Sequence, residues 1–174
     1  TPLPEDRSQV VTNAFIKTRL RTVRSRLVWL GYLDEKEKPE PGRLFIGYSA
    51  RRAIKDFQAE AGLTVDGWVG PETWTALEEL VSFEHPLSAA EWLSKPPQHQ
   101  RALWRAVRLR LSVLGLPKLP KPCQTLETAW PGLVGFSELA LRLKLMKAPL
   151  TQKNTQKVLD LLFEFHREDF VPEA

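Results

Sequence analysis

The chain has 174 residues, of which 43% are hydrophobic and 26% charged, and it carries a formal net charge of +4. This balance is typical of one globular domain or two small ones and excludes a wholly disordered chain. A single cysteine, Cys123, excludes an internal disulfide framework. No apolar run approaches the roughly 18 to 20 residues that span a bilayer, so no transmembrane segment is expected.

The first helix is predicted from Ala14 onward. Residues 1–12 are polar with two early prolines and are expected to form a loose lead-in. Apolar residues then recur at alternating steps of four and three, which places them on one helical face: Ile16, Leu20, Val23, Leu27 and Leu30. Gly31 can end this helix in a left-handed conformation. The chain begins at Thr1 and its one methionine is Met146, which predicts a segment processed from a longer chain.

Two more helices are predicted on either side of a Gly-rich turn. An apolar face is carried first by Ala53, Ile54, Phe57 and Ala61, and then by Trp74, Leu77, Leu80 and Val81. Residues 64–70 form the turn, and Pro71 suits the first position of the helix that follows, where a missing N–H costs nothing. Short helices with such connections favour an all-α three-helix bundle over residues 13–82.

Residues 83–100 are predicted to be an ordered linker. The segment holds three prolines and one short possible helix. Ser88 and Glu91 have the spacing of a capping box, in which each side chain bonds the other residue's backbone.

Residues 101–174 are predicted to be a degenerate second three-helix unit. Val23 to Tyr32 aligns without a gap on Val107 to Leu116. Further pairs follow along the chain: Gly47-Tyr48-Ser49 aligns with Gly135-Phe136-Ser137, and Ala76-Leu77 with Val158-Leu159. The second copy lacks the Gly-rich turn. The expected fold class is therefore all-α, with two related three-helix units in tandem.

Several short motifs of the first unit are those of a known family. They are Leu30-Gly31-Tyr32, the Ala-Ile-Lys-Asp-Phe-Gln run that ends at Gln58, the Gly62 to Thr73 segment with its Asp-Gly-x-x-Gly pattern, and Ala76-Leu77. With these motifs, residues 15–82 resemble the peptidoglycan-binding repeat attached to bacterial cell-wall amidases, lytic enzymes and L,D-transpeptidases. Two departures concern the first half of the repeat: Arg43-Leu44 replaces an Asp-Gly pair, and Ala50 replaces a threonine.

The resemblance implies a non-catalytic module that holds a larger enzyme or envelope protein on peptidoglycan, in the periplasm or outside the cell. It implies a binding surface beside the turn, for the stem peptide or the glycan. By position, the nominated ligand-binding residues are Tyr48, Arg51, Gln58, Asp66, Gly67, Trp68, Gly70, Thr73 and Trp74.

Six of these residues also have a purely structural interpretation. Gly67 and Gly70 permit backbone angles that a Cβ resists, and Asp66 can bond its own turn. Trp74 has core spacing, and Gln58 is expected to satisfy the turn or to lie on the helix surface. Trp68 is equally compatible with ligand contact and with core packing.

Basic residues repeat on one helical edge in the two copies, as Lys17, Arg21 and Arg24, and again as Arg101, Arg105 and Arg108. A solvated flank is the first interpretation, and contact with an anionic wall polymer or membrane surface is the second. Nucleic-acid binding is not expected, because the positive excess is small and no recognition motif accompanies it.

No catalytic, metal or cofactor site is predicted. His85, His99 and His166 lack metal-ligand spacing, and Cys123 has no histidine partner in the sequence pattern. The chain is therefore not expected to be an enzyme. The alternative to wall binding is a protein-interaction scaffold in an envelope or secretion assembly, which would use the second unit to contact a partner protein.

Overall fold

The computed structural model describes residues 13–34, 36, 48–81, 87–116 and 123–165. This part of the chain is helical throughout and contains no strand, as the sequence predicts. The elements in chain order are α1 (Asn13–Trp29), α2 (Tyr48–Ala61), α3 (Pro71–Val81), α4 (Ala89–Leu93), η1 (Pro97–His99), α5 (Arg101–Val113), α6 (Leu126–Arg142), η2 (Gln152–Asn154) and α7 (Thr155–Glu164).

Helix α1 ends as its glycine predicts. Gly31 has a φ of +84°. Its N–H bonds the carbonyl of Val28 at 3.0 Å, and the next N–H, of Tyr32, bonds the carbonyl of Leu27 at 2.9 Å. These two bonds form a Schellman motif, which satisfies carbonyls that the end of a helix would leave unpaired. Helix α5 ends in the same way at Gly115, where φ is +72°.

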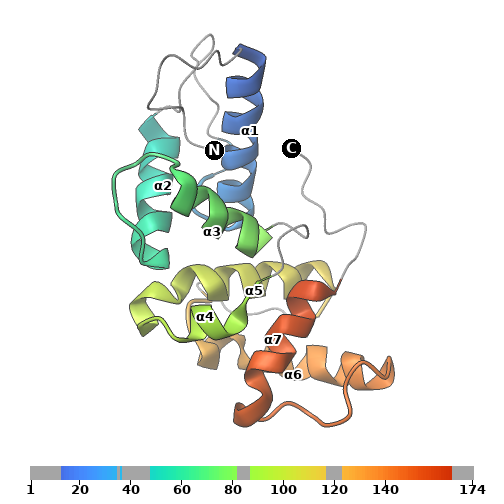
Figure 1. The fold of residues 1–174 in the computed structure, drawn as a ribbon. Coiled ribbons are helices and arrows are strands. Elements are labelled where there is room, and N and C mark those ends of the chain that lie inside the picture. Colours follow the sequence, from blue (N-terminus) through green and yellow to red (C-terminus); the bar gives the residue numbers. More distant parts are fainter. Residues whose placement is uncertain (1–12, 35, 37–47, 82–86, 117–122, 166–174) are drawn as a thin grey trace.

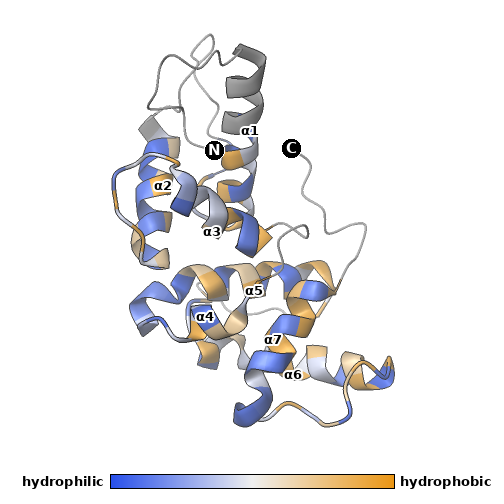
Figure 2. Ribbon diagram, in the orientation of Figure 1, coloured by the Kyte–Doolittle hydropathy of each residue, from blue (hydrophilic) through white to orange (hydrophobic). Residues whose placement is uncertain are grey.

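The helices form two layers that share one hydrophobic core (Figure 1). Helices α1, α2 and α3 lie together, and α4 to α7 lie below them in the view. Helix α5 packs against α2 and α3 on one side and against α6 and α7 on the other. Hydrophobic positions alternate with hydrophilic ones along α2, α5 and α7 (Figure 2), as amphipathic helices require. The two predicted units are therefore joined through α5 and not merely strung together.

The segment between the two units contributes to this core. Trp92 and Ala89 of α4 are buried, and the Trp92 indole Nε1 donates to the Glu79 carboxylate at 3.1 Å. The predicted capping box is wrong, because Ser88 makes no side-chain bond at the start of α4. The Ala89 backbone N–H instead donates to Asp160 of α7 at 3.2 Å. A capping hydroxyl is thus replaced by a carboxylate from a distant helix.

One part of the predicted alignment between the copies is also wrong. Tyr48 and Ser49 begin α2, whereas Phe136 and Ser137 lie in the middle of α6. The buried residues of α2 and α6 have the same spacing when Phe57 is set against Phe136 and Gln58 against Ser137. A shared Gly-aromatic-Ser triplet is a weaker signal than the spacing of the residues that a helix must bury.

Candidate functional site at the Gly-rich turn

The turn between α2 and α3 is organised by the side-chain amide of Gln58, which is only 1% exposed. Its Oε1 accepts from the backbone N–H groups of Asp66 at 3.1 Å and Gly67 at 3.0 Å. Its Nε2 donates to Asp66 Oδ1 at 2.9 Å, to the Trp68 carbonyl at 2.8 Å and to Thr73 Oγ1 at 3.1 Å. All the hydrogen-bonding capacity of the amide is used inside the turn, so Gln58 positions the turn.

Asp66 closes the tip of the turn. Its Oδ1 accepts from the Trp68 backbone N–H at 2.9 Å as well as from Gln58, which makes an Asx turn. The Trp68 N–H and the Gln58 amide together hold the pKa of this carboxyl below its usual value, because both stabilise the charged form. The carboxylate is exposed.

The two glycines of the turn have different requirements. Gly67 has a φ of +77°, and a Cβ there would lie 2.8 Å from Arg51 Nε and 2.9 Å from Arg51 Cγ. Gly70 has an ordinary φ, and no atom lies within 4 Å of the place where its Cβ would be. Its carbonyl accepts from the Trp74 N–H at 2.9 Å and so begins α3. Pro71 then occupies the predicted first helical position. Gly67 is needed for its backbone conformation, and Gly70 is not.

Trp68 projects from this rigid base. Its side chain is 52% exposed, and the Arg51 guanidinium lies 4.7 Å from the centre of its ring. Arg51 is itself exposed on α2. The geometry answers the question that the sequence left open, because an indole with half its surface in solvent is not a core residue. An exposed aromatic ring beside a cation is a surface that can stack on a sugar or on the apolar part of a peptide.

The remaining nominated residues are divided between the interior and the surface. Thr73 is 4% exposed and is bonded to Gln58, so it belongs to the support of the turn. Trp74 is half-buried against the core, and the Arg26 guanidinium lies 4.9 Å from the centre of its ring. Tyr48 is the first residue of α2, and its side chain lies outside the described residues. The structure therefore brings Arg51 and Trp68 together on an outer surface, above Gln58, Asp66 and Thr73.

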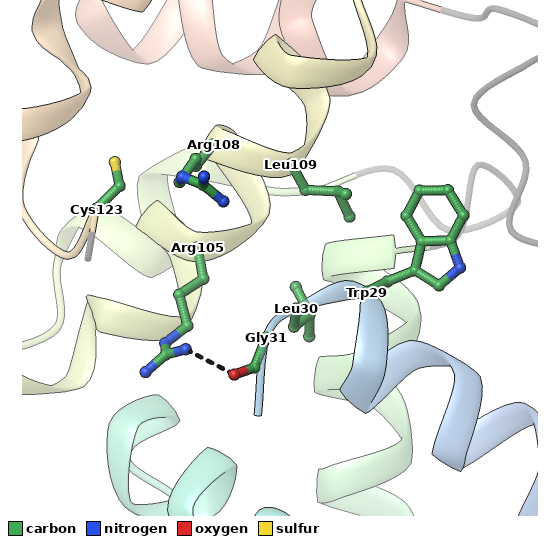
Figure 3. Close-up of a pocket in the computed structure, with 7 residues that line it drawn as sticks. All are labelled: Trp29, Leu30, Gly31, Arg105, Arg108, Leu109 and Cys123. Atoms are coloured by element: carbon green, nitrogen blue, oxygen red, sulfur yellow. Dashed lines mark hydrogen bonds between the residues drawn. The ribbon is translucent and has the colours of Figure 1, made fainter. Parts of the chain in front are cut away.

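A separate cavity of about 380 Å³ lies between the two units, away from the turn. It opens between the end of α1 and the middle of α5 (Figure 3). Its walls are Trp29, Leu30, Gly31, Arg105, Arg108, Leu109 and Cys123. Sequence patterns do not predict this cavity, because the residues that line it come from distant parts of the chain.

The basic residues of α5 do not form the free stripe that the sequence indicated. The Arg105 guanidinium is paired with Glu60 of α2 at 3.0 Å, and Arg108 lines the cavity. Of the three, only Arg101 is exposed. On α1, Arg21 is exposed and Arg24 is half-buried, while the Lys17 side chain lies outside the described residues.

Neither a metal site nor a membrane span is present among the described residues. No group of three or more His, Cys, Asp or Glu side chains there could hold a metal ion. None of the helices described is long and apolar enough to cross a membrane.

Comparison with known proteins identifies the first unit. Residues 17–77, about a third of the 174-residue chain, match the family model described as "Putative peptidoglycan binding domain". Neither the curated proteins nor the solved structures contain a significant match to the chain. Helices α1 to α3, with the Gln58-centred turn between the last two, thus match the peptidoglycan-binding domain family that the sequence motifs indicated.

Proposed function

We propose that the chain binds peptidoglycan without catalysing a reaction, through the surface formed by Trp68 and Arg51 at the Gly-rich turn. The family match supports the substrate class. The observation that carries the proposal is the contrast between an exposed Trp68 and the buried side chains of Gln58 and Thr73 beneath it. An aromatic side chain held in solvent on a rigid base loses little conformational entropy when it meets a ligand.

The chemistry of this surface suits the wall polymer. The apolar faces of sugar rings stack on an indole, and the carboxylates of stem peptides pair with a guanidinium. Lys55 and Arg52 are exposed on α2 beside Arg51 and extend the cationic surface. A chain with a net charge of +4 is also attracted to an anionic polymer at low ionic strength. The ligand contact is therefore assigned to either the stem peptide or the glycan.

In this proposal the module anchors a larger envelope protein or wall enzyme, in the periplasm or at the outer cell wall. Its role is to raise the local concentration of the attached protein at the wall, which needs only modest affinity. No catalytic residue is assigned to the chain.

The test is sedimentation with purified insoluble peptidoglycan at low salt, with the wild-type chain and two variants. Trp68→Ala is expected to lower the bound fraction at least severalfold. Val65→Ala is the matched control, because Val65 is 51% exposed and belongs to the same loop. It is expected to bind like the wild type. If the wild-type chain stays in the supernatant, or if both variants bind equally well, the proposal fails.

We also propose that the second unit is a degenerate copy of the first. The buried residues of α3, which are Thr73, Ala76, Leu77, Leu80 and Val81, have the same spacing as those of α7, which are Thr155, Val158, Leu159, Leu162 and Phe163. Arginines at the matching positions of α1 and α5 stack on an aromatic ring of the third helix. Arg26 lies 4.9 Å from the centre of the Trp74 ring, and Arg110 lies 4.1 Å from that of Phe163.

One feature of this second unit favours a scaffold role, the alternative function. Leu143 and Leu145 are 51% and 48% exposed in the segment after α6, where Lys144 adopts a φ of +59°. Apolar side chains on such a loop suit contact with an envelope protein. Photo-crosslinking from position 143 in cell-envelope extracts tests this role. A product that disappears when Leu145→Gln is added supports it, and the absence of any product at wild-type expression contradicts it.

A further inference from the structure

The cavity between the two units has the chemistry of a small-ligand site. Its volume of about 380 Å³ falls within the range of roughly 300 to 1,000 Å³ that is usual for such sites. The wall is mixed, with apolar surface from Trp29 and Leu109 and polar atoms from two arginines. The seven lining residues include no carboxylate. A ligand with both an apolar part and an anionic group matches this wall.

The two arginines of the cavity differ in how far they are already neutralised. Arg105 Nε and Nη2 donate to the two oxygens of Glu60 at 3.0 and 3.2 Å, and Nη1 donates to the Gly31 carbonyl at 3.3 Å. Arg105 is thus committed to the fold. Figure 3 shows this bond to Gly31 and draws the Arg108 side chain between those of Cys123 and Leu109.

Arg108 is the uncommitted cation. Its Nε is buried and has no hydrogen-bond partner in the described part of the chain. A buried donor of a charged group without a partner is costly to leave unpaired, and an arriving acceptor removes that cost. The cavity therefore presents one positive charge that no described carboxylate neutralises.

The charge of the site selects a carboxylate over a phosphate. One free guanidinium matches one negative charge and can bind a carboxylate through two parallel bonds. The end of α1 also faces the cavity at Leu30 and Gly31, and helix C-termini carry partial negative charge. A doubly charged phosphate would be repelled there, whereas the N–H groups of a peptide are attracted to carbonyl oxygens.

We propose that this inter-unit cavity binds the terminal carboxylate of a short peptide, with Arg108 as the residue that binds the anion. Trp29 and Leu109 contact the apolar side chain of the last residue. The site is independent of the Trp68 surface and uses residues of both units, so a lone family domain would lack it. The peptide can be a stem peptide or the C-terminus of another protein, since the two share this chemistry.

The experiment is an NMR titration of the full chain, labelled with ¹⁵N, using acetyl-Ala-Ala and its C-terminal amide. Saturable shifts at Gly31, Leu109 and Cys123 are expected with the acid. The amide is expected to bind at least tenfold more weakly, because it lacks the charge. Equal affinity for the acid and the amide, or no shift at these residues at millimolar peptide, overturns the proposal. Inorganic phosphate is a third probe, and a phosphate that binds more tightly than the acid overturns it as well.

Two substitutions complete the test. Arg108→Met is expected to lower the affinity for the acid at least tenfold. Arg101→Met is the matched control, because Arg101 is exposed on the same helix and does not line the cavity. Unchanged binding in Arg108→Met, with an unchanged melting temperature, contradicts the proposal. If that variant does not fold, the comparison of acid with amide in the wild-type chain still decides.

A last arm distinguishes the two sources of the peptide. Soluble stem peptide released from peptidoglycan is compared with a proteinaceous peptide of equal length that ends in L-alanine. If the stem peptide binds more tightly, the ligand of the cavity is a peptidoglycan stem. If the proteinaceous peptide binds more tightly, the ligand is the C-terminus of another protein. Arg108→Met is expected to keep a larger bound fraction than Trp68→Ala in sedimentation with insoluble peptidoglycan, whereas only Arg108→Met is expected to lose the preference for the acid over the amide, so failure of one site is separable from failure of the other.

Discussion

The guanidinium of Arg105 is bonded to both oxygens of the Glu60 carboxylate, at 3.0 and 3.2 Å, and this pair joins α5 to α2. Arg105 also lies 4.3 Å from the centre of the Tyr32 ring, whose hydroxyl donates to the same carboxylate at 3.0 Å. Only 23% and 15% of the two side chains remain exposed. A bidentate pair with this little exposure is a structural contact between the units.

Replacing Arg105 is therefore expected to destabilise the whole chain. Arg105→Met should lower the free energy of unfolding by about 1 to 3 kcal/mol, because it leaves the Glu60 carboxylate half-buried without its cation. Urea unfolding followed by circular dichroism measures the change. Arg101→Met, the exposed control on α5, should stay within about 0.5 kcal/mol of the wild type. Equal midpoints for the two variants would contradict the assignment.

The support of the turn depends on the amide of Gln58. Gln58→Met keeps the length of the side chain but leaves the Asp66 and Gly67 N–H groups without their acceptor. The free energy of unfolding, measured in urea, is expected to fall by about 2 to 4 kcal/mol. The control is Ser137→Ala, at a buried position of α6, whose hydroxyl makes one local bond to the Val134 carbonyl. A loss of less than about 1 kcal/mol is expected there. Similar losses in the two variants would refute this role of Gln58.

The two glycines of the turn provide a matched pair. Gly67→Ala places a Cβ 2.8 Å from Arg51 Nε at a φ of +77° and should cost about 1 to 3 kcal/mol. Gly70→Ala meets no atom within 4 Å, and should be neutral within about 0.5 kcal/mol. Melting temperatures of the two variants are sufficient to compare them. A reversed order would show that the turn differs from the one described.

Asp66 predicts an acid dependence of stability. Because its folded pKa is lowered, its contribution is present above the unfolded pKa of about 3.9 and is lost as the pH falls through the folded value. Asp66→Asn can keep both bonds to Oδ1 but carries no charge. The variant should be less stable than the wild type at pH 7, and the two should converge as the pH falls below the folded pKa of Asp66. Urea midpoints across this range measure the effect, and a difference that grows on acidification would contradict it.

Tyr32 predicts a loss of stability at alkaline pH. Burial, reinforced by the Glu60 carboxylate, raises the pKa of its phenol above the ordinary value near 10. The contribution to stability is complete below pH 10 and is lost as the pH rises through the folded pKa. The chain has two tyrosines, so Tyr48→Phe isolates this one. Tyrosinate absorbance at 295 nm should then appear only together with alkaline unfolding, and a separate titration near pH 10 in the folded chain would contradict this.

Local sequence patterns were sufficient to predict much of the structure of the first unit. The spacing of Val23, Leu27 and Leu30, the glycine after them, and Pro71 at the start of α3 each act within one or two helical turns, so the helix limits could be read from the sequence. The turn could be located by Asp66 and Gly67 for the same reason. That Gln58 supports this turn was one of two interpretations, and its bonds reach eight to fifteen residues along the chain.

Contacts between distant segments could not be read in this way. Arg105 and Glu60 are 45 residues apart, and a basic stripe on α5 has the same spacing whether it faces solvent or a second unit. The cavity around Arg108 could not be predicted for the same reason, since it exists only where α1 meets α5. The exposure of Trp68 could not be predicted for another reason. The position of an aromatic residue in a turn does not determine which residues cover its ring.

Helix α2 makes a contact near each of its ends. Arg51, beside Trp68, and Glu60, paired with Arg105, are nine residues apart on this helix, or about 13 Å at ~1.5 Å per residue. The Trp68 surface is therefore linked to α5 through α2 and the guanidinium–carboxylate pair. A load on this surface would be shared by the helices on both sides of that pair.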